Sequence, residues 1–412
     1  MDIYTLVALV IGITTAIALV NQNTIRLPDS IGLMFFSFIV VLAALVLQSL
    51  GLDIFARYAQ IVAQKIDFHT LLINGLLSYL LFAGAMSIDI RQVLSHAKTI
   101  ALLSSLSVIL STILLGSFIF FIAPPLGVSI PFLICLLFGA LIAPTDPIAV
   151  LATFKKLQAP ASLSVILAGE SLLNDGVGIV VFITLYHLSF LHEPITWQHV
   201  SYLFFSQALG GLLYGTILGF IGDKLMRMAS AQVAMLVTIT IASTGYILAK
   251  PLQVSGPLAM VAAGMFIGNK LRTKPLIQQA NDLILSSWDL IDEVLNAILF
   301  LLLGLQVLIS IQPSTHFALA IISIPVALAT RLISTWLPSR LLLRKASRPA
   351  HFQRVLTWGG LRGGLAVALA LSLPPSSTKS AILSMTFMIV SFSVLVQGNT
   401  IKYFLPSRES RN

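Results

Sequence analysis

The chain has 412 residues, of which 57% are hydrophobic and only 9% are charged, and its formal net charge is +9. The mean hydropathy is +0.98, whereas soluble domains hold about half apolar residues. This composition excludes an ordinary soluble protein, and the single cysteine excludes internal disulfides and cysteine-based metal sites.

The apolar residues form about 13 blocks, most of them roughly 20 residues long, which is the length of a helix that crosses a bilayer. We expect spans near residues 3–20, 29–48, 68–88, 99–122, 130–152, 162–187, 200–222, 231–249, 254–268, 286–309, 316–338, 352–373 and 378–399. The first block has no basic segment before it and no cleavage site after it, which favours a retained helix over a signal peptide. The sequence therefore predicts an all-α polytopic membrane protein.

Lysines and arginines are unevenly shared between the connections. Most of the 24 lie in or beside the odd-numbered connections and the C-terminal tail, 401–412. The positive-inside rule then places these segments in the cytoplasm and the N-terminus outside. Because juxtamembrane residues account for the net charge, no nucleic-acid partner is expected.

Four ionisable residues lie nearest to the middle of predicted spans: Asp146, Glu170, Asp175 and Arg362. A charge at a helix centre costs about 2.5–3.5 kcal/mol on insertion scales, so an intramembrane charge indicates function by default. A structural ion pair that only fixes helix packing is the less favoured alternative for any one of them. Three acids with one base, however, favour an ion site.

The segment AGESLLNDG (168–176) places two of these acids on different faces of one helix. Ser171 and Asp175 are four residues apart and share a face, while Glu170 and Asn174 share a second face about 100° away. The first pair can offer a carboxylate and a hydroxyl to an ion. The second can offer a carboxylate and an amide to other groups of the protein. We expect Glu170 to pair with Arg362; a pairing of Arg362 with Asp175 would instead leave the site without a free carboxylate.

Two predicted spans carry helix breakers at their centres. The fifth reads GALIAPTDPIAV (139–150), and its prolines at 144 and 147 each remove a backbone donor and free a carbonyl. The twelfth reads TWGGLRGGLAV (357–367), with four glycines around its arginine. Such interruptions are tolerated in a membrane only inside protein or beside a cavity. Gly210, Gly211 and Gly215, by contrast, fit close helix packing.

The two broken spans are seven apart in the chain, so two six-helix units around them have opposite orientations. Broken helices at matching positions of inverted repeats indicate the central site of a transporter. Within a single transmembrane domain, 1–412, we expect a first repeat at about 1–190, a linker helix at about 200–222 and a second repeat at about 231–400.

The freed carbonyls, hydroxyls and carboxylates at these places are hard oxygen ligands. No histidine or cysteine is near, so zinc and copper are not expected, whereas a small hard cation such as Na⁺ or a proton suits the set. We expect the ion to be bound by Asp175, Ser171, Thr145 and Asp146. Asp175 can hold either a proton or a cation but not both, and that competition is an exchange mechanism.

Four segments resemble the NhaP-type sodium–proton antiporters, which share a branch with the eukaryotic sodium–proton exchangers. They are APTDP (143–147), GESLLNDG (169–176), NAILFLLLGL (296–305) and WGGLRGG (358–364). The resemblance covers essentially the whole chain. It implies a thirteen-helix inverted repeat with a dimerisation domain and a six-helix transport core, in which the broken fifth and twelfth helices cross.

The resemblance also implies roles for single residues. Asp175 becomes the carboxylate that binds the ion and the proton, and Asn174 stands where electrogenic relatives carry a second aspartate. The remaining positions match residues around the ion (Ser171, Thr145, Asp146) and a structural ion pair in the core (Glu170, Arg362).

One stretch departs from the family pattern. Many members carry an acid in the third span, in a FEG-like sequence, where this chain reads LLFAGAM (80–86) with Ala83 at the position in question. This removes acid-assisted ion access from that helix but leaves the central site. We interpret three further acids as solvated capping residues at the cytoplasmic end of the tenth span: Asp289, Asp292 and Glu293. A pH-sensing or ion-funnel role is the alternative.

We therefore expect a homodimeric secondary transporter in the cell inner membrane that exchanges Na⁺, or Li⁺, for H⁺ by electroneutral alternating access without a cofactor. Potassium–proton exchange remains the alternative, because the ligand types do not separate the two ions. A channel would need a continuous polar pore lining. The sequence instead has one polar cluster at mid-membrane, flanked by apolar residues, which favours a carrier. An intramembrane hydrolase would need a GxGD-type motif, an HExxH motif or a nucleophile–base pair, so we do not expect an enzyme.

Overall fold

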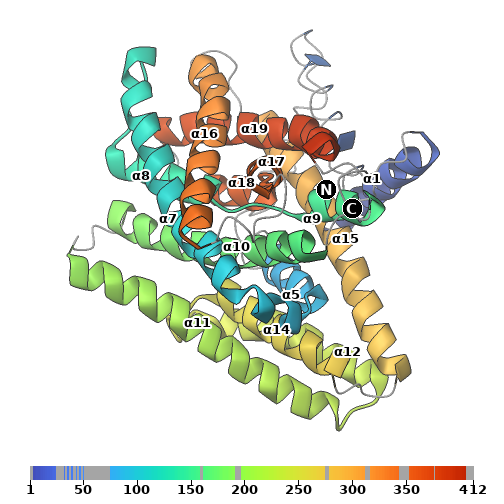
Figure 1. Ribbon diagram of the computed structural model, residues 1–412. Coiled ribbons are helices and arrows are strands. Elements are labelled where there is room, and N and C mark those ends of the chain that lie inside the picture. Colours follow the sequence, from blue (N-terminus) through green and yellow to red (C-terminus); the bar gives the residue numbers. More distant parts are fainter. Residues whose placement is uncertain are drawn as a thin grey trace, which may run out of the picture.

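The computed structural model describes residues 3–24, single positions between 32 and 50, and residues 75–157, 161–190, 196–273, 278–310, 316–342, 352–374 and 376–404 (Figure 1). The predicted second span, near 29–48, and most of the C-terminal tail lie outside these residues. Over the described ranges the regular structure is helical, apart from one isolated bridge between two residues. The all-α prediction is confirmed.

The described helices follow one another along the chain. They are α1 (Ile3–Asn23), α5 (Leu77–Ser87), α6 (Ile90–Ser95), α7 (Ala97–Ile122), α8 (Phe132–Ile142), α9 (Ile148–Leu157), α10 (Ala161–Phe190), α11 (Trp197–Met226), α12 (Ala231–Thr240), α13 (Tyr246–Ala249), α14 (Gly256–Thr273), α15 (Gln278–Ser310), α16 (Phe317–Leu342), α17 (Phe352–Trp358), α18 (Gly364–Leu371), α19 (Ser377–Phe392) and α20 (Gly398–Thr400). Within the described residues, 6 helical stretches are long and apolar enough to cross a membrane. Each coincides with a predicted span, which supports a polytopic protein; the total of about 13 spans and the inverted repeat stay predictions.

A first group of helices is held together by very close backbone approaches. Gly211 and Gly215 of α11 face the backbone of α14, where an added Cβ would collide with carbonyl oxygens. Gly264 and Gly268 of α14 lie against carbonyl groups of α5 in the same way. Small residues let helices pack backbone to backbone, so α11, α14 and α5 form one unit, along one side of the molecule in Figure 1. The close-packing interpretation is confirmed for Gly211 and Gly215, whereas Gly210 lies against the side chain of Val254, before α14 begins.

Helix α15 joins this first group through a buried tryptophan. The indole nitrogen of Trp288 donates to the hydroxyl of Thr238 on α12 at 2.9 Å. The ring of Trp288 also lies 4.8 Å from that of Phe82 and 6.0 Å from that of Tyr79, centre to centre. A buried indole is held in place when its N–H finds such a partner. We refer to α5, α11, α12, α14 and α15 as the scaffold.

The second group of helices surrounds the two broken spans. Helix α7 packs on α8, α10 and α16, and α19 packs on α16 and α18. The predicted fifth span is α8 and α9 with an extended link, and the predicted twelfth span is α17 and α18 with a second link. In Figure 1 the short helices α17 and α18 lie among the longer ones. We refer to α7–α10 and α16–α20 as the core.

Candidate functional site

The two interruptions touch each other at the centre of the core. The backbone N–H of Asp146 donates to the carbonyl of Leu361 at 2.8 Å, which forms the isolated antiparallel bridge. Gly363 lies so close that a Cβ there would be 2.6 Å from Asp146 Oδ2. A side chain at position 363 would therefore displace the Asp146 carboxylate. The structure thus shows the two broken helices meeting, as the resemblance implies.

Arg362 holds the fifth-span interruption through its backbone. Its Nη1 donates to the carbonyl of Ala143 at 2.6 Å and to that of Pro144 at 2.9 Å. In an unbroken helix the Ala143 carbonyl would accept from residue 147, but Pro147 has no N–H. The guanidinium group, which is only 3% exposed, therefore satisfies a carbonyl that the proline frees.

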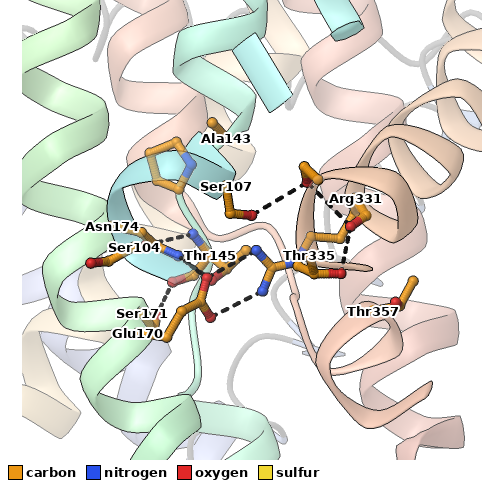
Figure 2. A network of polar contacts seen from close by, with 12 residues as sticks. Ser104, Ser107, Ala143, Thr145, Glu170, Ser171, Asn174, Arg331, Thr335 and Thr357 are labelled. Atoms are coloured by element: carbon orange, nitrogen blue, oxygen red, sulfur yellow. Dashed lines mark hydrogen bonds and ion pairs between the residues drawn. The ribbon is translucent and has the colours of Figure 1, made fainter. Parts of the chain in front are cut away.

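Helix α10 holds the same interruption from the other side, as Figure 2 shows. Asn174 Nδ2 donates to Thr145 Oγ1 at 2.8 Å and to Glu170 Oε1 at 2.9 Å, and Asn174 Oδ1 accepts from the Thr145 N–H at 3.2 Å. Ser171 Oγ donates to the carbonyl of Thr145. The i, i+4 pair Glu170–Asn174 thus serves the protein, as its spacing predicts.

The predicted ion pair between Glu170 and Arg362 is wrong. Glu170 instead accepts two hydrogen bonds from Arg331 on α16, from Nη1 at 2.9 Å and from Nη2 at 3.0 Å (Figure 2). Both side chains are buried: that of Arg331 is 4% exposed and that of Glu170 is 1% exposed. A guanidinium fork fits a carboxylate in this bidentate way, which leaves Arg362 to the carbonyls described above.

Sequence reasoning missed Arg331, although it lies inside the predicted span 316–338. Its intramembrane position was the available signal, since buried arginines in spans mark functional or structural sites. Polar groups of the core also surround it: the Thr335 hydroxyl donates to its carbonyl at 2.8 Å, and Gln353 Nε2 donates to that hydroxyl at 2.7 Å.

A cavity of about 680 Å³ lies between the core and the scaffold. All four predicted ion ligands contribute to its wall: Thr145, Asp146, Ser171 and Asp175. The Asp175 carboxylate makes no hydrogen bond to any residue that the structure describes, and its side chain is partly exposed to this space. The structure therefore brings the predicted ligands together around an available carboxylate; which of them bind an ion stays a prediction.

The scaffold wall of this cavity is acidic on one helix and apolar on another. Asp289, Asp292 and Glu293 line it, and they lie in the interior of α15, which begins at Gln278. Their interpretation as capping residues is therefore wrong. Ala83 of α5 also lines the cavity, so the position without the family's acid does face the central site.

A family model for the sodium/hydrogen exchanger transmembrane region matches residues 6–406. The chain belongs to this family. Among its relatives, the Na⁺/H⁺ antiporter NhaP of Pseudomonas aeruginosa is 40% identical over 402 residues, which are 96% of this chain and 95% of that protein. The Na⁺/H⁺ antiporter NhaH of Halobacillus dabanensis is 29% identical over 410 residues, or 97% of this chain and 96% of that protein.

A solved structure has the same fold. The sodium proton antiporter MjNhaP1 from Methanocaldococcus jannaschii superposes with a TM-score of 0.73 at 19% identity and covers 97% of both chains. This chain therefore has the fold of that antiporter structure. That agrees with the prediction of a polytopic helical membrane protein.

Including Arg331 changes the net charge of the core from the value that the sequence alone suggested. Three carboxylates (Asp146, Glu170 and Asp175) face two guanidinium groups (Arg331 and Arg362), where the sequence alone suggested one. With all groups in their ordinary ionised forms, the empty core therefore has one more negative charge than positive. A single monovalent cation or a single proton makes it neutral.

Proposed function

We propose that the protein exchanges Na⁺ for H⁺ across the membrane, one for one, with Asp175 as the carboxylate for which the two compete. The proposal is supported by the names of the relatives, which are Na⁺/H⁺ antiporters, and by the family. The observation that carries it is the Asp175 carboxylate, which lines the large cavity and is not held by a hydrogen bond from any described residue.

The other two core acids suit other tasks. Glu170 is held by Arg331 and Asn174, so it fixes α10 against α16 rather than taking up an ion. Asp146 contributes a fixed negative charge, and its backbone N–H is held by the carbonyl of Leu361. Thr145 and Ser171 supply oxygen ligands beside Asp175, and such ligands suit a small hard cation.

The charge of the core favours electroneutral exchange. An empty core carries one excess negative charge, and a charge moved through a poorly solvated region is costly. The core loaded with one Na⁺ or one H⁺ is neutral in both cases. Only loaded forms then move easily between the two sides of the membrane, which couples the ion to the proton by alternating access.

We further propose that the core moves against the scaffold, that two copies associate through the scaffold, and that the protein resides in the cell membrane with its N-terminus outside. The large cavity supports the first point, because it separates the two groups of helices. The excess of basic residues in the odd-numbered connections supports the orientation. We expect no cofactor and no enzymatic activity, in keeping with a transporter family.

The test is proton flux from proteoliposomes driven by gradients of Na⁺, Li⁺ or K⁺, with the wild type, Asp175→Asn and Asp289→Asn compared. Asp289 lines the same cavity, so its variant is a matched control for the loss of one acid. We expect exchange with Na⁺ to vanish in Asp175→Asn and to persist in Asp289→Asn. Wild-type exchange rates in Asp175→Asn would refute the role of Asp175 as the ion-binding carboxylate. Proton flux driven by K⁺ alone would show K⁺/H⁺ exchange instead of Na⁺/H⁺ exchange.

A further inference from the structure

A second, much smaller cavity lies in the core, and of the elements that line it only the link from α17 to α18 also contributes to the wall of the large one. The space there that the centre of a water molecule can occupy is about 10 Å³. It lies between α16, the link from α17 to α18, and the π-helical turn Ser393–Gln397 that joins α19 to α20. Its polar lining includes Arg331, Thr357, Arg362, Ser393 and Gln397.

One buried hydrogen-bond donor faces this small cavity without a partner. Arg331 uses Nη1 and Nη2 for Glu170 (Figure 2), while its Nε is buried and has no hydrogen-bond acceptor among the residues that the structure describes. Gly360 lies beside this nitrogen, and an added Cβ there would be 2.5 Å from Nε. Because position 360 is a glycine, the space beside Nε stays open.

The π-helical turn brings acceptors to the same place. Ser393 Oγ donates to Gln397 Oε1 at 2.6 Å, and Gln397 Nε2 donates to the carbonyl of Trp358 at 3.1 Å. The Gln397 oxygen keeps a second lone pair, because an amide oxygen accepts two hydrogen bonds. The hydroxyl of Thr357 donates to Gln353 O at 2.9 Å and accepts from Gln353 Nε2 at 3.4 Å. Its second lone pair is a further acceptor on the wall. Turns of this kind are frequent at functional sites.

We propose that this cavity binds one water molecule, which accepts a hydrogen bond from Arg331 Nε and donates to oxygens of Gln397 and Thr357. The volume is the room that one buried water needs, and a buried water makes two to four hydrogen bonds to such groups. The charge of Arg331 is already matched by Glu170, so the cavity does not call for an anion. The water ties α16 to Thr357 of α17 and to the π-helical turn Ser393–Gln397. It also holds the Nε side of the Arg331 guanidinium group, whose Nη1 and Nη2 bind Glu170.

The first test is a pair of high-resolution cryo-EM maps of the full-length protein in lipid nanodiscs, one in sodium chloride and one in sodium gluconate. We expect a density peak within about 3.2 Å of Arg331 Nε in both maps. A peak in chloride alone would show a halide site, and no peak in either map would show a dry cavity. Both outcomes would overturn the proposal.

The second test uses two substitutions at one position. Gly360→Ala and Gly360→Ser add the same Cβ beside Nε, but only serine brings a hydroxyl that can replace the water. We expect the serine variant to unfold at a temperature higher than the alanine variant by about 2 °C or more. Gly398 is the control, because a Cβ there meets only ordinary contacts, the nearest at 3.6 Å.

At position 398 the order is expected to reverse, with Gly398→Ala at least as stable as Gly398→Ser, since alanine is the better helix former. Equal unfolding temperatures for the two variants at position 360, or a higher one for Gly360→Ala, would contradict a bound water.

Discussion

Removing Arg331 should destabilise the core strongly, because it strands a buried carboxylate. Arg331→Met keeps an unbranched apolar stem but deletes both hydrogen bonds to Glu170, whose side chain is 1% exposed. Among the described residues, Glu170 would keep only the amide donor of Asn174 at 2.9 Å. Removing one partner of a buried pair costs roughly 3–5 kcal/mol. At about 2–4 °C per kcal/mol, the unfolding temperature should fall by roughly 6–20 °C.

The assay is thermal unfolding in detergent of a double-mutant cycle formed by Arg331→Met, Glu170→Gln and the two together. The double variant removes the charge along with its partner, and such neutral replacements are often tolerated. We therefore expect it to be more stable than Arg331→Met alone, with a coupling energy of up to about 3 kcal/mol. A second cycle, Arg362→Met with Glu170→Gln, should show a smaller coupling.

Additive effects in the first cycle, or a wild-type unfolding temperature for Arg331→Met, would refute the pairing seen in the structure. A larger coupling energy in the second cycle than in the first would show that Glu170 pairs with Arg362, as the sequence predicted.

Two other changes probe the crossing of the broken helices. Gly363→Ala should abolish most exchange measured in proteoliposomes, because its Cβ would lie 2.6 Å from Asp146 Oδ2. Gly84→Ala, whose Cβ would have its nearest contact 3.9 Å away, should retain exchange. Equal activities of the two variants would contradict this account. Arg362→Met should lower the unfolding temperature, because the carbonyls of Ala143 and Pro144 lose their donor at roughly 1–3 kcal/mol for each unsatisfied group, and an unchanged temperature would show that other groups satisfy them.

Much of the site was predictable because it depends on local spacing. Helical geometry alone places Glu170 with Asn174, and Ser171 with Asp175, on two faces. The prolines at 144 and 147 and the glycines around Arg362 show where two helices break, and only protein or a cavity can accept a broken helix in a membrane. These inferences need no knowledge of which helices are neighbours.

The pairing of Glu170 was not predictable in this way. Glu170 and Arg331 are separated by 161 positions, and hydropathy places Arg331 in a span without showing which helix it faces. Arg362 was the more conspicuous choice because glycines surround it. Its real partners are the carbonyls of Ala143 and Pro144 at the break in the fifth span, and residue charge does not reveal them. The acids of α15 were misplaced for a related reason, since hydropathy marks the apolar part of a helix and misses the polar turns at Gln278–Leu285.

The place of Asn174 leads to a last prediction, about stoichiometry. Replacing Asn174 by aspartate introduces the second acid that electrogenic relatives carry, yet we expect exchange to stay electroneutral. Asn174 is buried, belongs to the network of Thr145 and Glu170, and does not line the large cavity. A carboxylate there would lie within hydrogen-bond distance of Glu170. Two carboxylates so close cannot both be ionised, so they would share one proton throughout the cycle.

The measurement is the current of Asn174→Asp proteoliposomes on a solid-supported membrane after a Na⁺ jump, with Asn174→Ser as the uncharged control. Both variants lose the two hydrogen bonds that Asn174 Nδ2 donates, to Thr145 Oγ1 and to Glu170 Oε1, so both should unfold at lower temperatures than the wild type. Only the aspartate tests the charge. The retained proton adds no moving charge, because it never leaves the buried pair for the cavity where Asp175 meets the ion. We therefore expect no sustained current and no dependence of the exchange rate on an imposed membrane potential. A sustained current in Asn174→Asp alone would mean that position 174 communicates with the ion pathway and that one carboxylate does not set the stoichiometry.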